Sequence, residues 1–141
     1  MINGISREAF ERFCRRRRIR LAVLFGSSIT GRRTAHSDLD LAFWLRDEPK
    51  PSSELDLTNV LMSLLHCNDV DVVVLNHANP LLQWQVASTG KPLYERQAGA
   101  FVRFQVRAFR RYHDGHRIYQ WTRAYLHEWL KATRHAGSHP A

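Results

Sequence analysis

The sequence has few cysteines and no long apolar run. Cys14 and Cys67 are the two cysteines among 141 residues, and both lie among apolar neighbours at helical spacing. We interpret them as small buried side chains, not as a disulfide or as metal ligands. No segment approaches the ~20 apolar residues of a membrane-spanning helix, and no apolar secretory core follows the basic residues near the N-terminus. We therefore expect a cytoplasmic protein without a membrane partner.

Acidic residues are also scarce. The chain has 13 Asp and Glu against 21 Lys and Arg, a formal net charge of +8. This balance favours a polyanionic ligand such as nucleotide phosphates, RNA or an acidic protein surface, and charge alone does not choose among them. Arginines crowd residues 15–20, where a solvated helix end is the more common interpretation and contact with a polyanion is the alternative.

The hydrophobic content of 44% is enough for one compact domain spanning residues 1–141, with a core at about 1–96. Apolar spacing and capping residues predict helices at 7–18, at 52 or 53 to about 68, at 80–90, and at about 97–112 and 118–131. Runs of apolar, β-branched and aromatic residues predict strands at 21–25, 38–45, 70–75 and 92–95. The fold class is therefore α/β or α+β, with a helical extension at about 97–134 and a flexible tail at 135–141.

Two carboxylates in the second predicted strand carry the first chemical signal. Asp38-Leu39-Asp40 begins this strand, ten residues after Gly26-Ser27 closes the first one. Because side chains alternate along a strand, Asp38 and Asp40 project from the same face. Neighbouring carboxylates repel each other unless a cation neutralises them, and oxygen ligands at this spacing suit Mg²⁺ bound together with substrate phosphates.

A third carboxylate, Asp71, interrupts an otherwise apolar strand. If that strand lies beside residues 38–45, Asp71 completes a cluster that can hold two metal ions for phosphoryl or nucleotidyl transfer. As the acid nearest the acceptor, Asp71 is our candidate for accepting the acceptor's proton. A purely structural acid is the alternative interpretation, and Asp69 is the substitute third carboxylate, although its place before the strand is typical of a turn residue.

Gly26 and Ser27 supply the other half of the predicted site. Glycine lets the backbone approach a phosphate closely, and the serine hydroxyl adds a hydrogen bond. A strand that ends in Gly-Ser is commonplace, so the prediction depends on the combination with the carboxylates. We predict catalytic and metal-binding roles for Asp38, Asp40 and Asp71, and nucleotide binding for Gly26 and Ser27.

With these residues assembled, the sequence resembles the polymerase-β-like nucleotidyltransferases, in particular the minimal MNT or MntA antitoxins. The resemblance spans about residues 21–114 and includes the segments 70–76, 79–82 and 90–95. It implies a nucleotidyltransferase fold with a small mixed sheet. It also implies an antitoxin that transfers AMP from Mg-ATP, with two Mg²⁺ ions, to a tyrosine of a partner HEPN-domain RNase toxin in a hetero-oligomer. Many relatives place an arginine before the second glycine of the loop, whereas here Thr30 precedes Gly31.

Other functions stay open at this point. The chain could be an antitoxin that masks the toxin by binding alone, a nucleotidyltransferase for tRNA or a small molecule, or a nucleic-acid-binding protein. We interpret Trp84, Trp121 and Trp129 as core residues because aromatic residues at helical spacing are usually buried. His113 and His116 are interpreted as exposed residues near a helix break at Gly115, not as metal ligands.

Overall fold

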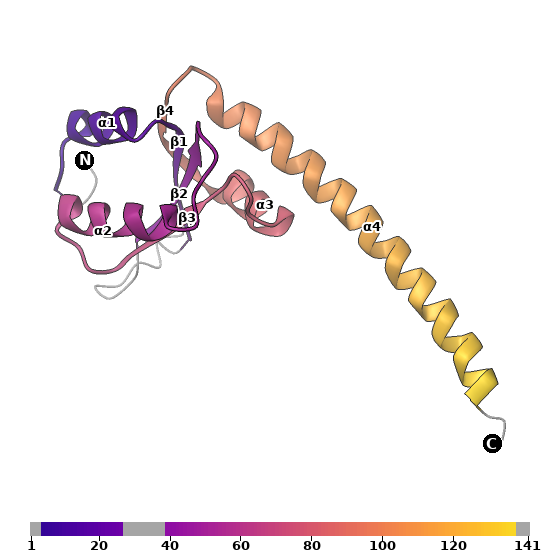
Figure 1. Cartoon of the computed structure of the whole chain (residues 1–141). Helices are drawn as coiled ribbons and strands as arrows, with labels where there is room; N and C mark the ends of the chain where they lie inside the picture. Colours follow the sequence, from indigo (N-terminus) through magenta and orange to yellow (C-terminus); the bar gives the residue numbers. More distant parts are fainter. Residues whose placement is uncertain (1–3, 27–38, 138–141) are drawn as a thin grey trace.

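Helices and strands alternate along most of the chain (Figure 1). The computed structural model describes residues 4–26 and 39–137. Its elements are α1 (Arg7–Arg16), β1 (Ile19–Phe25), β2 (Leu39–Leu45), α2 (Ser53–Leu65), β3 (Val70–Val74), α3 (Pro80–Thr89), β4 (Lys91–Glu95) and α4 (Ala100–Gly137). The predicted tail beyond residue 137 lies outside the described residues.

The four strands form one mixed sheet in the order β3-β2-β1-β4. β1 is antiparallel to both β2 and β4, whereas β2 and β3 are parallel. A parallel pair requires a crossover connection, and α2 provides it between β2 and β3. The prediction of a small mixed sheet flanked by helices is confirmed.

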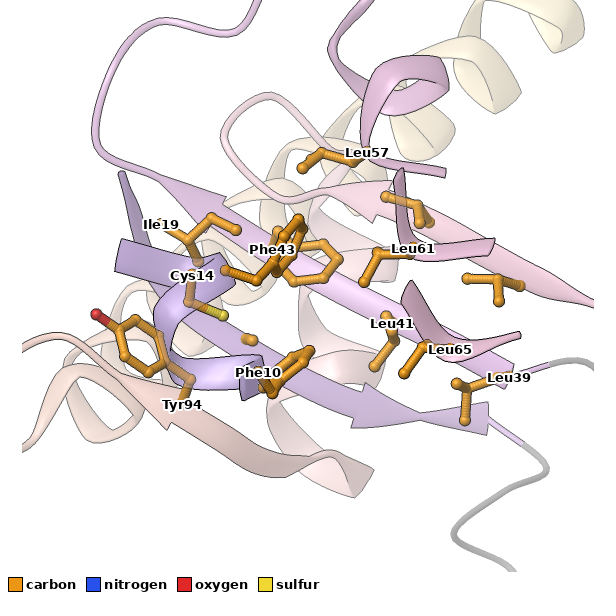
Figure 2. Close-up of a cluster of buried hydrophobic side chains, with 14 of the residues drawn as sticks. Phe10, Cys14, Ile19, Leu39, Leu41, Phe43, Leu57, Leu61, Leu65 and Tyr94 are labelled. Atoms are coloured by element: carbon orange, nitrogen blue, oxygen red, sulfur yellow. The ribbon is translucent and has the colours of Figure 1, made fainter. Parts of the chain in front are cut away.

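One face of the sheet packs against α1 and α2. Alternate residues of β2 point into this layer, where Leu39, Leu41 and Phe43 are at most 2% exposed. Figure 2 shows these side chains meeting Phe10 and Cys14 of α1 and three leucines of α2. The other face packs against α3 and the first turns of α4, through buried residues that include Val23, Ala42, Val86 and Phe104. The molecule therefore has three layers, with the sheet in the middle.

The ends of three helices are fixed by side-chain caps. The Ser6 hydroxyl accepts a hydrogen bond from the Ala9 amide at 3.2 Å, and Asn79 Oδ1 accepts one from the Leu82 amide at 2.8 Å, with Pro80 at the first helical position. The predicted start of α3 is thus confirmed. A Glu95 carboxylate oxygen accepts hydrogen bonds from the Gly99 and Ala100 amides at 2.8 and 3.2 Å, which caps α4.

The predicted break at Gly115 is wrong. Residues 100–137 form one continuous helix of 38 residues, about 57 Å long at 1.5 Å per residue. A single glycine inside a helix costs only about 1 kcal/mol relative to alanine, and packing of α4 against α3 outweighs this cost. A Cβ atom on Gly115 would lie 3.9 Å from Pro80 Cγ, and Arg111 Nη1 donates a hydrogen bond to Gln83 Oε1 at 2.8 Å. α2, in contrast, ends earlier than predicted, at Leu65, because His66 adopts a left-handed conformation with φ 51°.

The first turns of α4 pack against the body, while the later turns project away from it (Figure 1). Trp121 and Trp129 are 82% and 53% exposed, so their interpretation as core residues is wrong. Trp84 does pack, with its ring 5.2 Å from the Tyr112 ring in a stacked arrangement. In the described ranges, no helix combines the length and the apolar character needed to cross a membrane.

Candidate active site

Asp40 and Asp71 lie side by side on neighbouring strands. The register of the parallel pair β2–β3 places Asp40 opposite Asp71, and adjacent strands are about 4.8 Å apart. Because residues in register have the same orientation, both side chains project from the same face of the sheet. The third predicted strand therefore does lie beside the second, which is the arrangement that an acid cluster requires.

Burial of the flanking residues explains which face carries the acids. Leu39 and Leu41 on β2, and Val70 and Val72 on β3, are all buried against α1 and α2. Alternation along each strand turns Asp40 and Asp71 to the opposite face. Asp40 is half-buried and Asp71 is exposed, so Asp71 is the more accessible of the two to an acceptor molecule.

Gly26 lies directly against the Asp40 carboxylate. Phe25, the last residue of β1, pairs with Asp40 across the antiparallel ladder, and Gly26 follows with φ 77°. A Cβ atom added to Gly26 would lie 2.1 Å from Asp40 Oδ2. Position 26 therefore requires glycine for two reasons. The backbone there is left-handed, and the Asp40 carboxylate occupies the space that a Cβ atom would take. The sequence predicted the close approach of a phosphate here but not the contact with Asp40.

Ser27 and Asp38, the other two predicted site residues, lie outside the described residues, as do Thr30 and Gly31. The described backbone begins again at Leu39, whose amide donates a hydrogen bond to the Asp69 carbonyl at 2.7 Å. The Asp69 side chain is exposed and its residue precedes β3. This placement fits its interpretation as a turn residue, whose main chain secures the start of the β2–β3 pairing.

The donor set at this end of the sheet fits a hard cation. Asp40 and Asp71 offer carboxylate oxygens, the ligands that Mg²⁺ prefers. Residues 4–26 and 39–137 contain no group of three or more His, Cys, Asp or Glu side chains suited to a metal ion, and Asp38 lies outside these ranges. Two of the three predicted ligands are thus placed together by the fold.

The two cysteines are free thiols and take no part in this site. Cys14 is fully buried and Cys67 is partly buried. Burial, with a smaller contribution from the nearby Glu11 carboxylate, raises the pKa of the Cys14 thiol well above its usual range. A thiol in such surroundings stays neutral and unreactive. The interpretation of Cys14 as a small buried side chain is confirmed.

A pocket at the opposite end of the sheet was missed by the sequence analysis. Its lining includes Arg20, Arg46, Arg96 and Arg103. These arginines are separated by up to 83 positions in the chain. No local spacing could have brought them together, and the general excess of basic residues was the sole signal.

Residues 8–99 match the family described as Polymerase beta, Nucleotidyltransferase. The chain therefore belongs to the polymerase beta nucleotidyltransferase family, as its resemblance indicated. Within that class it is similar to the protein adenylyltransferase MntA of Aphanizomenon flos-aquae (strain 2012/KM1/D3), with 36% identity over 99 residues. This alignment covers 63% of the chain and 65% of the relative, so the chain spans just under two thirds of the length of the relative.

Solved structures agree with this assignment. A crystal structure of a toxin-antitoxin with AMP-PNP contains a chain with a TM-score of 0.65 and 26% identity, over 92% of this chain and 99% of that one. A chain of the toxin-antitoxin MntA-HepT gives a TM-score of 0.58 at 25% identity, over 91% and 96% of the two chains. The predicted nucleotidyltransferase fold is confirmed.

Proposed function

We propose that the protein is an antitoxin adenylyltransferase that transfers AMP from Mg-ATP to a tyrosine hydroxyl of a partner HEPN-domain RNase toxin. The observation that carries this proposal is the pairing of Asp40 with Asp71 beside Gly26, in a chain of the nucleotidyltransferase family. The relative named protein adenylyltransferase MntA supports AMP as the transferred group. The toxin-antitoxin structure with AMP-PNP supports both the nucleotide and the kind of partner.

The proposed reaction is a single displacement at the α-phosphorus of ATP. The tyrosine oxygen forms a bond to the α-phosphorus. The bond between the α-phosphorus and the oxygen that bridges it to the β-phosphorus breaks, and pyrophosphate leaves with the electron pair of that bond. A free tyrosine has a pKa of about 10, so its proton must be taken up as the oxygen attacks. We assign the uptake of that proton to Asp71, which is the exposed member of the acid pair.

We assign the predicted site residues to binding of the metal ion and the nucleotide. Asp38, Asp40 and Asp71 would bind Mg²⁺, which supplies positive charge to the phosphates of ATP and to the leaving pyrophosphate. Gly26 has no Cβ atom and so leaves room for the Asp40 carboxylate at the end of β1, and we assign the close approach of the triphosphate to the Gly26-Ser27 backbone. The Ser27 hydroxyl would donate a hydrogen bond to a phosphate oxygen. Because the proposed reaction consumes ATP, we propose the cytoplasm as its location.

The outer part of α4 supports a protein partner. Trp121, Tyr125 and Trp129 recur every four residues and are 82%, 69% and 53% exposed. This spacing places the three aromatic side chains on one face of the helix. A row of large exposed apolar side chains usually marks a surface that another protein covers. We assign this face to the toxin, with which the antitoxin would form a hetero-oligomer.

Mass spectrometry tests the catalytic part of the proposal. The purified chain is incubated with ATP, Mg²⁺ and the product of the adjacent gene, if that gene encodes a small helical protein. An AMP-sized mass increase on one or more tyrosines of that product is expected, and none is expected with Asp40→Asn. A product that gains no mass, or gains it equally with the variant, would contradict the enzyme.

The same reagents separate the enzyme from the two other functions. If the chain neutralises the toxin by binding alone, the double variant Asp38→Asn/Asp40→Asn still suppresses the RNase activity of the toxin. If the acceptor is tRNA or a small molecule, radiolabel from α-labelled ATP appears in that fraction and not on protein. Our proposal requires loss of neutralisation in the double variant and label on the toxin.

A further inference from the structure

A pocket opens at the end of the sheet opposite Gly26 and Asp40. Its volume is about 440 Å³, and four arginines line it together with Trp44, Gln97 and Ala100: Arg20, Arg46, Arg96 and Arg103. We call it the arginine pocket. Each of the four arginines comes from a different segment, namely β1, the residues after β2, the residues after β4, and α4. The tertiary structure, and not their spacing in the sequence, brings these arginines together.

The arginine pocket is separate from the candidate active site. Arg46 follows Asp40 by six residues along β2 and its extension, a distance of about 20 Å at the rise of a strand. On β1, Arg20 lies at the start of the strand, whereas Gly26 follows its end. A ligand in this pocket would therefore not be the nucleotide held by the acids.

Within residues 4–26 and 39–137, none of the four pocket arginines forms an ion pair with an acidic side chain. The ion pairs in the described part of the chain involve other basic residues, namely Arg7, Arg15, Arg18 and His77. Glu95 is adjacent in sequence to Arg96, but its carboxylate accepts hydrogen bonds from the Gly99 and Ala100 amides. Four guanidinium groups around one cavity repel each other unless an anion lies between them.

Contacts within the fold hold two of the four pocket arginines, Arg20 and Arg103, in place. The Arg20 guanidinium lies over the Trp44 ring at 5.3 Å, and that of Arg107 lies over the same ring at 5.9 Å. The Trp44 ring is also 6.0 Å from the Phe104 ring. Arg103 Nη1 donates a hydrogen bond to the Ala98 carbonyl at 3.2 Å. Because Arg20 and Arg103 are held before any ligand arrives, less side-chain entropy is lost on binding.

The segments that carry the arginines are also tied together by backbone hydrogen bonds. The Arg96 amide donates to the Arg20 carbonyl at 2.9 Å, and the Arg46 amide donates to the Arg18 carbonyl at 3.0 Å. These bonds continue the pairing of β1 with its two neighbours beyond the ends of the strands. The spacing between the basic side chains is therefore set by the sheet.

We propose that the arginine pocket binds a ligand with several phosphate groups, independently of the active site. Guanidinium groups match phosphate oxygens in a two-pronged geometry, and the volume is that of a small-molecule site. Arg20 and Arg107 already lie over the Trp44 ring, so we assign recognition to the phosphates. Two sources share this chemistry: a free polyphosphate or nucleotide, and the backbone of a single RNA strand.

Isothermal titration calorimetry of the full chain tests the proposal. Inorganic triphosphate and a ten-nucleotide single-stranded RNA are titrated separately in the presence of EDTA, which disfavours binding at an active site that needs Mg²⁺. At least one probe is expected to bind with one-to-one stoichiometry. Arg46→Gln/Arg96→Gln should weaken that binding roughly ten-fold or more, because it removes two charged donors. Binding should also weaken as salt is raised.

A matched control removes the same charge elsewhere. Arg12→Gln/Arg17→Gln alters two exposed arginines of the α1 region, on the other face of the sheet, and should change the affinity by less than two-fold. Circular dichroism checks that all variants fold, and Arg103→Gln serves as a second pocket variant. Binding of triphosphate identifies a small ligand, and binding of RNA alone identifies a strand; either supports the proposal.

The proposal is overturned if neither probe binds, or if the pocket and control variants weaken binding equally. The second result would show that general positive charge, and not the pocket, attracts the probe. Neither result bears on adenylyl transfer, because ATP and the toxin are absent from the titration.

Discussion

The two ends of one sheet carry opposite charges. Asp40 and Asp71 lie together at one end, beside Gly26, while Arg20, Arg46, Arg96 and Arg103 surround a pocket at the other. The same strands, β1 and β2, reach both ends. Since the core between them is apolar on both faces, each end is free to serve a different ligand.

This difference shows how little the net charge says about a site. The formal charge of +8 predicted an anionic ligand but not where it binds. At the acid end, we propose that an anion binds only with a cation as mediator. At the arginine end, we propose that it binds directly. Variants at each end should therefore act independently, as expected for sites this far apart.

The largest expected effect is at the acid end. Asp40→Asn should lower the rate of adenylyl transfer at least about 10³-fold, because it removes a charge that holds the cation with the phosphates. Transfer is measured as label on the toxin in single-turnover assays. The melting temperature should stay the same or rise, since repulsion between carboxylates falls. A variant that retains activity would contradict the assignment of Asp40.

A substitution in the core between the two ends of the sheet should affect the active site and the arginine pocket together. Phe43→Ala removes a fully buried ring and should lower the free energy of unfolding by about 3–5 kcal/mol, measured by urea denaturation. Adenylyl transfer and binding in the arginine pocket should be lost together as the variant unfolds, because both sites are built on β1 and β2. Val102→Ala, at a position that is 60% exposed, is the control and should change stability by less than about 0.5 kcal/mol. An equal loss of unfolding free energy in the two variants would mean that the Phe43 ring does not contribute to the stability of the core.

Gly26→Ala sharpens the role of the contact with Asp40. Gly26 and Gly4 both have positive φ, 77° and 86°, but in the described structure a Cβ atom on Gly4 meets nothing within 4 Å. Gly4→Ala should therefore cost only the backbone term of about 1–2 kcal/mol. Gly26→Ala should cost more than this and should also slow adenylyl transfer. Urea denaturation and the label assay measure the two effects.

Two results together would contradict a role for the contact between Gly26 and Asp40. Gly4→Ala and Gly26→Ala would destabilise the protein equally, and Gly26→Ala would transfer AMP at the normal rate. Alanine is a suitable probe at both positions because it adds the Cβ atom and nothing else.

The smallest expected effect concerns the chemical reactivity of the two cysteines. Because burial raises the pKa of the Cys14 thiol, its thiolate fraction stays very low as pH rises from 7 to 9. Cys67 is only partly buried and should react with iodoacetamide faster than Cys14, which should react only after unfolding. Peptide mass spectrometry of the alkylated protein distinguishes the two cysteines. Comparable rates for both in the native protein would show that α1 opens readily from the sheet.

Local signals in the sequence predicted much of the fold. Asn79-Pro80 placed the start of α3, and Ser6 placed the start of α1, because capping involves residues only three apart. The apolar run around Asp71 predicted β3. The prediction of a break at Gly115 was wrong because helix propensity is a weak local preference, and the packing of α4 against α3 outweighs it here. Trp121 and Trp129 were misjudged because their spacing shows that they share a helix face but not whether anything covers it.

The sequence by itself determined which residue types were available for chemistry at the acid end, through the Gly26-Ser27 and Asp38-Leu39-Asp40 spacing and the alternation of side chains along a strand. Only the tertiary structure decided that β3 lies parallel to β2 with Asp71 in register with Asp40, and that four distant arginines meet around one pocket. Spacing along a chain fixes direction within one element, whereas contact between elements depends on how their apolar faces pack.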